Sequence, residues 1–308
     1  MEKQEMIREI NPKLKRINTR GGNSLQKKAA LINDLSGFGR CSLSVELPVL
    51  SLMQIECLLL PTCLLSNHTG YPSYYMKSLE ESMDPIMDEW KTLDVKLDAI
   101  ITGYLASVSQ VEHVLRFLSL FSSSLIVIDP VLGDDGKAYP GISKELEKAM
   151  KKLVGHASVL LPNLTEACLL TDTPWKDNFT KEEIEAMAFA LQRQGAKQVV
   201  ISGISQGEFI QECVLDQNQT ITWLKAKKEV ESRAGTGDLF CAVVSGYLLH
   251  GYSLAECVKQ AGDFVRAALL ETARLHVPPE EGVAFEMVLC RLCSCANRKA
   301  SNCSCSSS

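Results

Sequence analysis

From Ala29 onward, short apolar runs alternate with longer amphipathic stretches. Several runs are continuous Val, Ile and Leu, which is typical of strands covered on both faces. Strand–helix alternation of this kind favours right-handed βαβ units and a mainly parallel sheet. We therefore expect an α/β fold with helices on both faces of a central sheet. The expected strands are Ala29–Ile32, Cys57–Leu60, Ala99–Ile101, Leu125–Ile128, Ser158–Leu161 and Gln198–Ile201.

A hairpin and two long helices follow the sixth strand. The strand-like runs Glu208–Leu215 and Thr220–Leu224 are joined by a polar turn, which predicts an antiparallel hairpin at one edge of the sheet. Long helices are expected over Asp238–His250 and Ser253–Leu275, and a shorter one near Glu281. The helices expected between the strands are Ser42–Met53, Ser78–Thr92, Ser109–Leu120, Lys144–Leu153 and Lys181–Gln194.

The two ends of the chain differ in composition from the part between them. A length of 308 residues allows one large α/β domain or two small ones. Residues 1–28 are polar and mostly basic, with little apolar periodicity, and residues 293–308 are rich in Cys and Ser. Such compositions are typical of segments that do not join a core. We expect one folded domain over residues 29–292 and two disordered extensions.

The charge balance argues against two classes of partner. The chain has 32 Lys and Arg against 37 Asp and Glu, a net charge of -5. A nucleic-acid-binding domain is normally basic, and anionic membranes attract basic surfaces. The first 28 residues contain no apolar core of a signal peptide. The apolar stretch Leu239–Ala255 is interrupted by Ser245 and Gly246 and favours a buried helix ending at Gly251, with a membrane-spanning helix as the alternative.

The twelve cysteines form two groups. Seven lie singly among aliphatic residues, which is typical of buried free thiols in a reducing compartment and indicates a cytoplasmic protein. Five crowd the last 19 residues, where CxxC and CxC spacings could bind a soft metal. Their spacing fits no ordinary four-ligand zinc module, so a Cys-rich tail without metal is the favoured interpretation. These five are Cys290, Cys293, Cys295, Cys303 and Cys305.

Polar and glycine-bearing segments follow the expected strands. In an open parallel sheet, ligands bind beyond the carboxyl ends of the strands, so these segments are expected to meet at one edge. They are residues 33–39, 66–71, 102–104, 129–134, 162–166 and 202–203.

The segment Ala234–Asp238, AGTGD, directly precedes an expected apolar helix. Glycines at a helix start let several backbone N–H groups point at one spot, and the helix N-terminus adds positive partial charge. This arrangement predicts an anion hole for a phosphoryl group, with Asp238 placed to face a substrate hydroxyl. The alternative is a plain glycine turn with Asp238 as a helix cap. The chain has no GxxxxGK[ST] motif, so this is not a Walker-type site.

Acidic side chains form a second candidate group. Asp129 ends an expected buried strand, Asp134 lies five residues on, and Glu166 follows Asn163 at NxxE spacing. Magnesium bound to ATP phosphates prefers a few carboxylates and waters, so these residues predict a metal–nucleotide site. Taken singly, Asp129 fits a strand-end turn better, and Glu166 fits a solvated first-turn residue of a helix better. Their expected location at one edge with the anion hole reverses that preference.

A third group combines neutral hydrogen-bonding side chains with aromatic rings. It comprises residues 66–71, which include His68 and Thr69, and Tyr104. Such residues suit a flat heteroaromatic substrate, although a lone histidine is often structural. The five histidines have no convincing serine partner for a hydrolase triad.

Together these motifs resemble the pyridoxal kinases of the ribokinase-like superfamily. Their order and spacing match over residues 29–292. The GTGD motif marks the whole superfamily, whereas SNHTGY with DPVLGD is more specific to the vitamin B6 branch. The motifs are GTGDLF at 235–240, SNHTGY at 66–71, TGY at 102–104, DPVLGD at 129–134 and PNLTE at 162–166.

The resemblance implies a ribokinase-like fold and ATP-dependent phosphorylation of the 5′-hydroxymethyl group of pyridoxal, pyridoxine or pyridoxamine. It implies a homodimer, a magnesium ion and a monovalent cation such as K⁺. The implied base is Asp238, and the implied anion hole is Gly235, Thr236 and Gly237. The implied ATP and metal residues are Asp129, Asp134, Asn163, Glu166 and Ser202, with a lid over residues 135–139. The implied substrate pocket is Asp34, His68, Thr69 and Tyr104.

Two departures from the pattern leave alternatives open. Leu161 stands before Pro162 where the family usually has a hydroxyl or small residue, so a side-chain ligand for the monovalent cation is missing. The segment Asp34–Gly37, DLSG, resembles the Asp-x-Ser-Gly of hydroxymethylpyrimidine kinases, which phosphorylate a similar alcohol in thiamine synthesis. That activity is the second candidate. A catalytically silent carrier of pyridoxal phosphate is a third, although the intact Asp238, Glu166 and GTGD argue against it.

Overall fold

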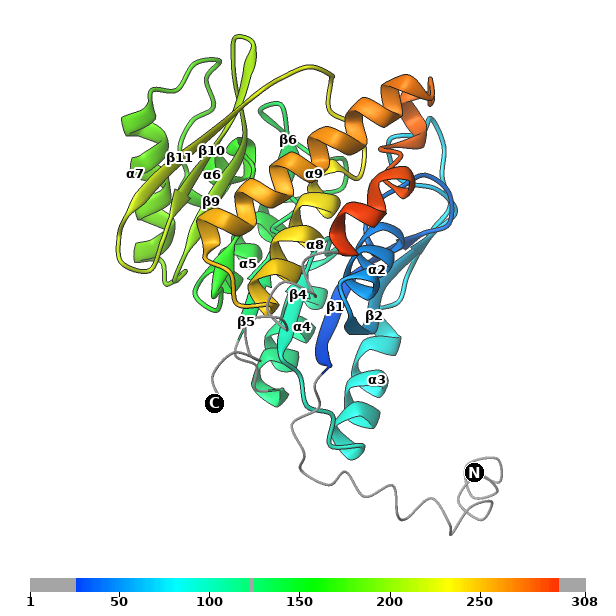
Figure 1. Cartoon of the computed structure of the whole chain (residues 1–308). Coiled ribbons are helices and arrows are strands. Elements are labelled where there is room, and N and C mark those ends of the chain that lie inside the picture. Colours follow the sequence, from blue (N-terminus) through cyan, green and yellow to red (C-terminus); the bar gives the residue numbers. More distant parts are fainter. Residues whose placement is uncertain (1–25, 122–124, 294–308) are drawn as a thin grey trace, which may run out of the picture.

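A nine-stranded sheet forms the centre of the computed structural model, which describes residues 26–121 and 125–293 (Figure 1). The strand order is β11-β10-β9-β8-β5-β4-β1-β2-β3. The strands are β1 (Lys27–Ser36), β2 (Ile55–Leu65), β3 (Met76–Ser78), β4 (Ala99–Thr102), β5 (Leu125–Ile128), β8 (Val159–Leu160), β9 (Val199–Gln206), β10 (Phe209–Leu215) and β11 (Ile221–Lys227).

The six expected strands form the parallel part of this sheet. Strand β1 pairs in parallel with β2 and β4, and the parallel pairing continues through β5 and β8 to β9. The expected edge hairpin is present as β10 and β11, and β10 also pairs antiparallel with β9. The opposite edge strand, β3, pairs antiparallel with β2 and was not expected. Its three residues are all exposed, so it carries no burial signal in the sequence.

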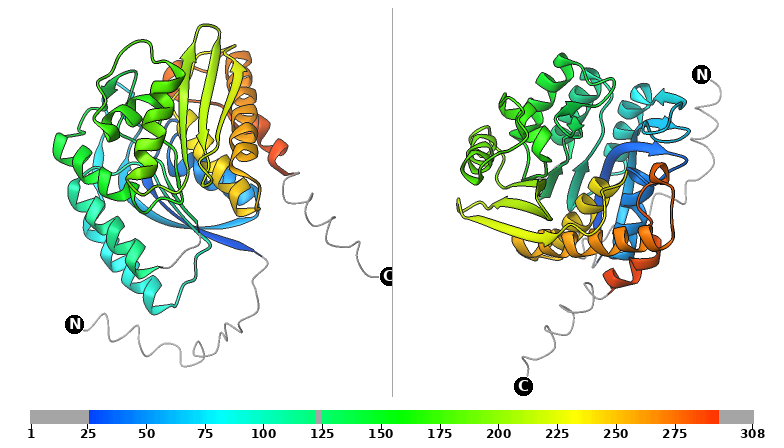
Figure 2. Two further views of the ribbon diagram at one scale, coloured as in Figure 1. Left: turned by 90° about the vertical axis from the view of Figure 1, so that its left-hand side faces the viewer. Right: turned by 90° about the horizontal axis from the view of Figure 1, so that it is seen from above.

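Helices cover both faces of the sheet, as Figure 2 shows from two further directions. Apolar side chains of α3 to α7 pack against one face, and those of α2, α8 and α9 pack against the other. The mainly parallel α/β fold with helices on both faces is therefore confirmed. The helices are α2 (Leu43–Leu52), α3 (Glu80–Thr92), α4 (Val108–Leu120), α5 (Lys144–Val154), α6 (Leu164–Thr171), α7 (Lys181–Arg193), α8 (Thr236–Leu249) and α9 (Leu254–Arg274).

Three local expectations differ from the structure. Helix α6 follows the PN dipeptide directly, in a segment expected as a polar connection. The expected helix near Glu281 is replaced by two 3₁₀ helices, η2 (Pro279–Glu281) and η3 (Glu286–Leu292). Gly282 separates them with φ 77°, which a continuous helix does not allow. Strand β1 begins at Lys27, so it includes two residues expected to lie in the N-terminal extension.

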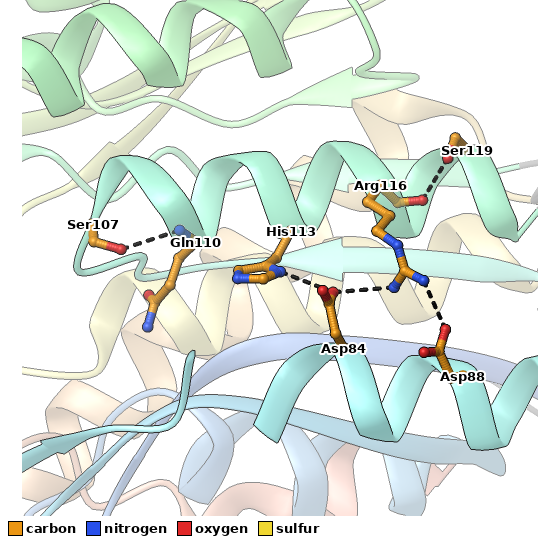
Figure 3. A network of polar contacts seen from close by, with 7 residues as sticks. All are labelled: Asp84, Asp88, Ser107, Gln110, His113, Arg116 and Ser119. Carbon is orange, nitrogen blue, oxygen red and sulfur yellow. Dashed lines mark hydrogen bonds and ion pairs between the residues drawn. The ribbon is translucent and has the colours of Figure 1, made fainter. Parts of the chain in front are cut away.

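Polar contacts join α3 to α4 on the outer surface (Figure 3). The Asp84 carboxylate on α3 contacts His113 Nδ1 at 2.9 Å and accepts from Arg116 Nη1 at 3.0 Å, both on α4. Arg116 Nη2 also donates to Asp88 at 2.7 Å. Exposed ion pairs contribute about 0–1 kcal/mol each, so this network orients the two helices more than it stabilises them.

Among the described residues, no helix is long and apolar enough to cross a membrane. The stretch expected as a buried helix ending at Gly251 is α8, which ends at Leu249 and is followed by Gly251 with φ 77°. Among the described residues, the seven scattered cysteines are joined by no disulfide, and six of them are buried. Cys290 and Cys293 are exposed, whereas Cys295, Cys303 and Cys305 lie outside the described residues. Most of both expected extensions, residues 1–25 and 294–308, lies outside them too.

Candidate active site

Asp238 lies in the first turn of α8, directly after the glycines of the GTGD segment. Gly235 precedes the helix with φ 81°, and a Cβ at this position would lie 2.0 Å from the carbonyl oxygen of Arg40. Only glycine allows this close approach of two backbone segments. No side chain caps the first turn, so its amide end is left for a ligand. The helix N-terminus and its N–H groups favour an anion there, as the sequence predicts.

Burial changes the proton affinity of Asp238. Its pKa is raised from the ordinary 3.8 to about 6, mainly by loss of solvent and also by the nearby charge of Asp34. The backbone N–H of Ser42 and the Asn33 amide oppose this rise because they stabilise the ionised form. A carboxylate with a pKa near 6 is a better proton acceptor than an ordinary aspartate and is still ionised at neutral pH.

Asn33 joins Asp238 to two other parts of the fold. Its side-chain oxygen accepts from the backbone N–H groups of Asp34 at 2.9 Å and Tyr104 at 2.8 Å. These bonds fix the orientation of the amide, so Nδ2 faces the carboxylates. Nδ2 donates to Glu46 Oε1 at 3.0 Å and lies 3.4 Å from Asp238 Oδ1. Asn33 therefore links the ends of β1 and β4 to the first turn of α8.

Glu46 is a buried acid on α2 that the sequence analysis did not select. It is 1% exposed, and its Oε2 atom has no hydrogen-bond partner in the part of the chain that the structure describes. Burial raises its pKa well above the ordinary value, and the charge of Asp238 raises it further. The available signal was one charged residue between Leu43 and Leu50 on the expected apolar face of a helix. Sequence spacing alone does not place Glu46 near Asp238.

Asp34 is held rigidly beside the site. Its carboxylate accepts from the hydroxyl groups of Ser36, at 3.0 Å, and Ser42. Burial raises the pKa of Asp34, whereas these two hydrogen bonds and His68 lower it. Ser42 itself has φ 51°, a left-handed conformation that is unusual for a serine. Such backbone strain costs about 1–3 kcal/mol and is common in functional sites.

The expected acceptor-side residues follow β2 and β4. His68 Nε2 contacts the Glu280 carbonyl oxygen at 2.7 Å, and His68 Nδ1 accepts from the Gly70 N–H at 3.1 Å. Thr69 is exposed at the tip of the same loop. Tyr104 is half-buried, and burial raises its pKa to about 12, so it remains a neutral hydroxyl. A cavity of about 250 Å³ lies against residues 37–40 and Glu281, beside the His68 loop.

The expected nucleotide-side residues follow β8. Asn163 caps α6, and Glu166 completes a capping box with it. Glu166 Oε2 accepts from the Asn163 N–H at 2.9 Å, and Oε1 accepts from the Leu132 N–H at 2.9 Å. Glu166 is thus a first-turn helix residue, but it is buried rather than solvated. Burial raises its pKa to about 7, although both backbone bonds lower it.

Asp129 and Asp134 follow β5 and belong to the same region. Burial raises the pKa of Asp129 well above its ordinary value, and the charge of Glu166 adds to this effect. Asp134 is exposed and lies in a two-stranded hairpin, β6 (Gly133–Asp134) and β7 (Lys137–Ala138). The hairpin includes most of the expected lid. Its turn residue Gly136 donates its N–H to Thr165 Oγ1 at 2.9 Å.

These carboxylates fit a magnesium ion carried by a nucleotide. Neighbouring carboxylates that raise each other's pKa are relieved by a cation between them. Among the described residues, no group of three or more His, Cys, Asp or Glu side chains is arranged as a complete metal site. Magnesium commonly takes one or two carboxylates and completes its shell with phosphate oxygens and water. Asp129 and Asp134 suit that role better than Glu166, because both oxygens of Glu166 already accept backbone N–H groups.

Ser202 and Leu161 complete the nucleotide side. Ser202 lies within β9, and its N–H donates to the Pro162 carbonyl oxygen at 3.0 Å. It forms an isolated bridge with Asn163. Leu161 is buried in the apolar cluster that packs below α2 and α8. Its side chain therefore belongs to the core and supplies no polar ligand.

The structure thus brings the expected segments to one edge of the sheet. Sheet order places the loops after β8 and β9 on one flank, the loop after β2 on the other, and Asp238 near the end of β1 between them. The larger cavity, of about 400 Å³, is lined by Gln192, Lys197 and Gln219 among others and contains none of the expected site residues. Sequence reasoning missed Asn33, Ser42 and Glu46, whose contacts depend on the fold.

Comparisons with known proteins identify relatives of this chain. A family profile described as phosphomethylpyrimidine kinase matches residues 62–280. A pyridoxine/pyridoxal/pyridoxamine kinase of Bordetella avium is 28% identical over 270 residues, which cover 82% of this chain and 89% of that protein. A hydroxymethylpyrimidine/phosphomethylpyrimidine kinase of Haemophilus influenzae is 30% identical over 63% of this chain and 71% of its own length.

Solved structures share the fold over nearly their whole length. A putative phosphomethylpyrimidine kinase of Bacteroides thetaiotaomicron, crystallised with pyridoxal, is 36% identical with a TM-score of 0.82, covering 87% of this chain and 96% of that one. The pyridoxal kinase of Lactobacillus plantarum is 33% identical with a TM-score of 0.82, covering 87% and 97%. The resemblance to ATP-dependent kinases of this group is confirmed. The chain therefore belongs to the phosphomethylpyrimidine kinase family and has its ribokinase-like fold.

Proposed function

We propose that this chain transfers the γ-phosphoryl group of ATP to the 5′-hydroxymethyl group of pyridoxal, pyridoxine or pyridoxamine. The observation that carries the proposal is Asp238, a carboxylate with a pKa near 6 in the first turn of α8, beside the Gly235–Gly237 anion hole. Relatives named as pyridoxal kinases support the choice of acceptor.

In this mechanism, Asp238 accepts the proton of the substrate hydroxyl while the hydroxyl oxygen attacks the γ-phosphorus of ATP. The bond from that phosphorus to the bridging oxygen of ADP breaks, and ADP leaves. The N–H groups at the start of α8 stabilise the charge on the transferring phosphoryl group. Asp238 then releases its proton to solvent. Asp129 and Asp134 would hold a magnesium ion, which would neutralise charge on the phosphates.

The two substrates approach from opposite flanks of Asp238. We assign Asp34, His68, Thr69 and Tyr104 to the vitamin, because they follow β1, β2 and β4. We assign Asn163, Glu166 and Ser202 to the nucleotide, because they follow β8 or lie in β9. This separation lets donor and acceptor meet in line, which phosphoryl transfer requires.

Phosphorylation of hydroxymethylpyrimidine is the second candidate activity. The family profile, the Haemophilus influenzae relative and the Asp34–Gly37 segment favour it. Measuring kcat/KM for pyridoxal and for hydroxymethylpyrimidine on the same preparation tests the proposal. A higher value for pyridoxal supports it. A higher value for the pyrimidine assigns the chain to the second activity, and no turnover with either substrate supports a non-enzymatic pyridoxal phosphate carrier.

We further propose a cytoplasmic homodimer whose kinase domain runs from Lys27 to Leu292. The exposed apolar side chains near the β3 edge, Leu64, Tyr74, Tyr75 and Met76, are a suitable surface for a second copy. Tyr75→Asp is expected to lower the mass measured by light scattering from dimer to monomer.

K⁺ is proposed as an accessory ion held by backbone oxygens, since Leu161 offers no oxygen from its side chain. Replacing K⁺ by Na⁺ in the assay tests this.

A further inference from the structure

Burial of the Glu46 carboxyl costs folding free energy. Glu46 is almost completely buried and accepts a hydrogen bond from Asn33, and its second oxygen has no hydrogen-bond partner among the described residues. An unsatisfied buried polar atom destabilises a fold, and an apolar side chain of similar volume would fit the surrounding core better. A residue that weakens the fold beside an active site is a candidate for a functional role.

The hydrogen bonds of Asn33 indicate what that role is. Its oxygen is held by two backbone N–H groups, so the amide nitrogen and its two protons face Glu46 and Asp238. The contact with Glu46 is 3.0 Å and falls within the normal range, whereas the contact with Asp238 is 3.4 Å and is long. Glu46 therefore makes the shorter of the two contacts with the Asn33 amide nitrogen.

The strength of that second contact matters for catalysis. A full hydrogen bond from an amide to a carboxylate stabilises the ionised form and makes the carboxylate a weaker base. The contact of 3.4 Å gives Asp238 less of this stabilisation than a shorter hydrogen bond would. We propose that Glu46 is a positioning residue that holds the Asn33 amide away from Asp238 and so preserves the ability of Asp238 to accept the substrate proton.

This inference rests on the proposed function of Asp238 as base. Burial and the surrounding negative charges raise the pKa of Glu46 and so favour its neutral form. A neutral carboxyl still offers an acceptor oxygen to Asn33 without adding a second charge below Asp238. The titratable groups that face Glu46 or Asp238 are Asp34 on β1, Cys41 before α2, Cys57 on β2, Asp129 after β5, Tyr139 after β7 and Cys241 on α8.

The test is the pH profile of kcat/KM for the full-length enzyme with pyridoxal and ATP. In Glu46→Leu, the Asn33 amide loses its shorter contact, and its nitrogen is expected to move closer to Asp238. We expect the acidic limb of the kcat/KM profile to move to lower pH by roughly one unit. We expect kcat on the plateau above that limb to fall about three- to tenfold. The melting temperature should stay level or rise, because the unpaired oxygen is removed. Glu46→Gln keeps an acceptor oxygen and should retain the wild-type limb. Glu147→Gln, a buried glutamate on α5 away from the site, is the matched control and should change nothing.

A double mutant separates positioning from a general structural effect. If Glu46 acts through Asn33, Glu46→Leu should cause no further shift of the limb in an Asn33→Ala background. If Glu46→Leu does not fold, Glu46→Met carries the same expectations. An unchanged limb in the apolar variant, an equal shift in Glu46→Gln, or an additive double mutant would overturn the inference. These results are distinct from failure of the proposed function, which would appear as retained turnover in Asp238→Asn.

Discussion

The Asn33 amide nitrogen lies 3.4 Å from the Asp238 carboxylate, although the two residues are 205 positions apart in the sequence. This contact joins the end of a central strand to the first turn of α8. It places the proposed base at the middle of the sheet edge, where the loops of both substrates converge. The following predictions test the roles assigned around this contact.

Alanine substitutions at the two glycines of the anion hole should differ in their effects on stability and turnover. In Gly235→Ala, the new methyl group meets the Arg40 carbonyl at 2.0 Å and the backbone has φ 81°, so both melting temperature and turnover should fall. In Gly237→Ala, nothing lies within 4 Å of the methyl group, and alanine favours a helix by up to about 1 kcal/mol. This variant should keep its melting temperature and lose turnover, because the methyl group crowds the phosphoryl position. Equal turnover in Gly237→Ala and wild type would remove the anion hole from the mechanism.

Activity should depend on the ionisation of Asp238. Because its pKa is about 6, kcat/KM should fall as pH decreases through that value. Full activity down to pH 4.5 would contradict the role of Asp238 as base.

The same pKa makes a prediction about stability with the opposite pH dependence. The folded-state pKa lies above the ordinary 3.8, so folding is favoured by protonation of Asp238, and this contribution is lost as pH rises from about 4 through 6. Asp238→Asn is neutral at every pH and escapes this loss. Its melting temperature should exceed that of wild type by more at pH 7.5 than at pH 4. A difference that does not change with pH would mean that Asp238 has an ordinary pKa.

Substitutions on the two flanks should separate the two substrates. Thr69→Ala should raise KM for pyridoxal and leave KM for ATP nearly unchanged, with no change in melting temperature because Thr69 is exposed. Glu166→Gln should raise KM for ATP. It should also lower the melting temperature, because one of two backbone N–H groups loses its acceptor. Parallel losses for both substrates in Thr69→Ala would assign that residue a structural role.

The sequence predicts the parallel sheet well because its strands are continuous apolar runs and its helices are amphipathic. It does not predict β3, whose three residues are exposed, or the break at Gly282, which depends on close approach to the carbonyl oxygens of Arg40 and Ala234. Helix α6 is hidden because the capping motif around Asn163 and Glu166 is equally consistent with a nucleotide-binding loop.

Motifs locate Asp238 and the segments around it, because glycine turns and clustered carboxylates have local signatures. Asn33 and Glu46 have none. Asn33 is one polar residue at a strand end, and Glu46 is one acid in an apolar helix. Their importance follows from contacts between β1, α2 and α8, which only the tertiary structure brings together.

The most direct test of the account is the ATP-dependent conversion of pyridoxal by the full-length protein, measured beside Asp238→Asn. Wild type should form pyridoxal 5′-phosphate in equal amount to the ADP released. Asp238→Asn should remain folded and bind ATP but turn over roughly 10²–10⁴-fold more slowly. ADP release without the 5′-phosphate, or near-wild-type turnover by the variant, would contradict the assignment of Asp238 as the base of a pyridoxal kinase.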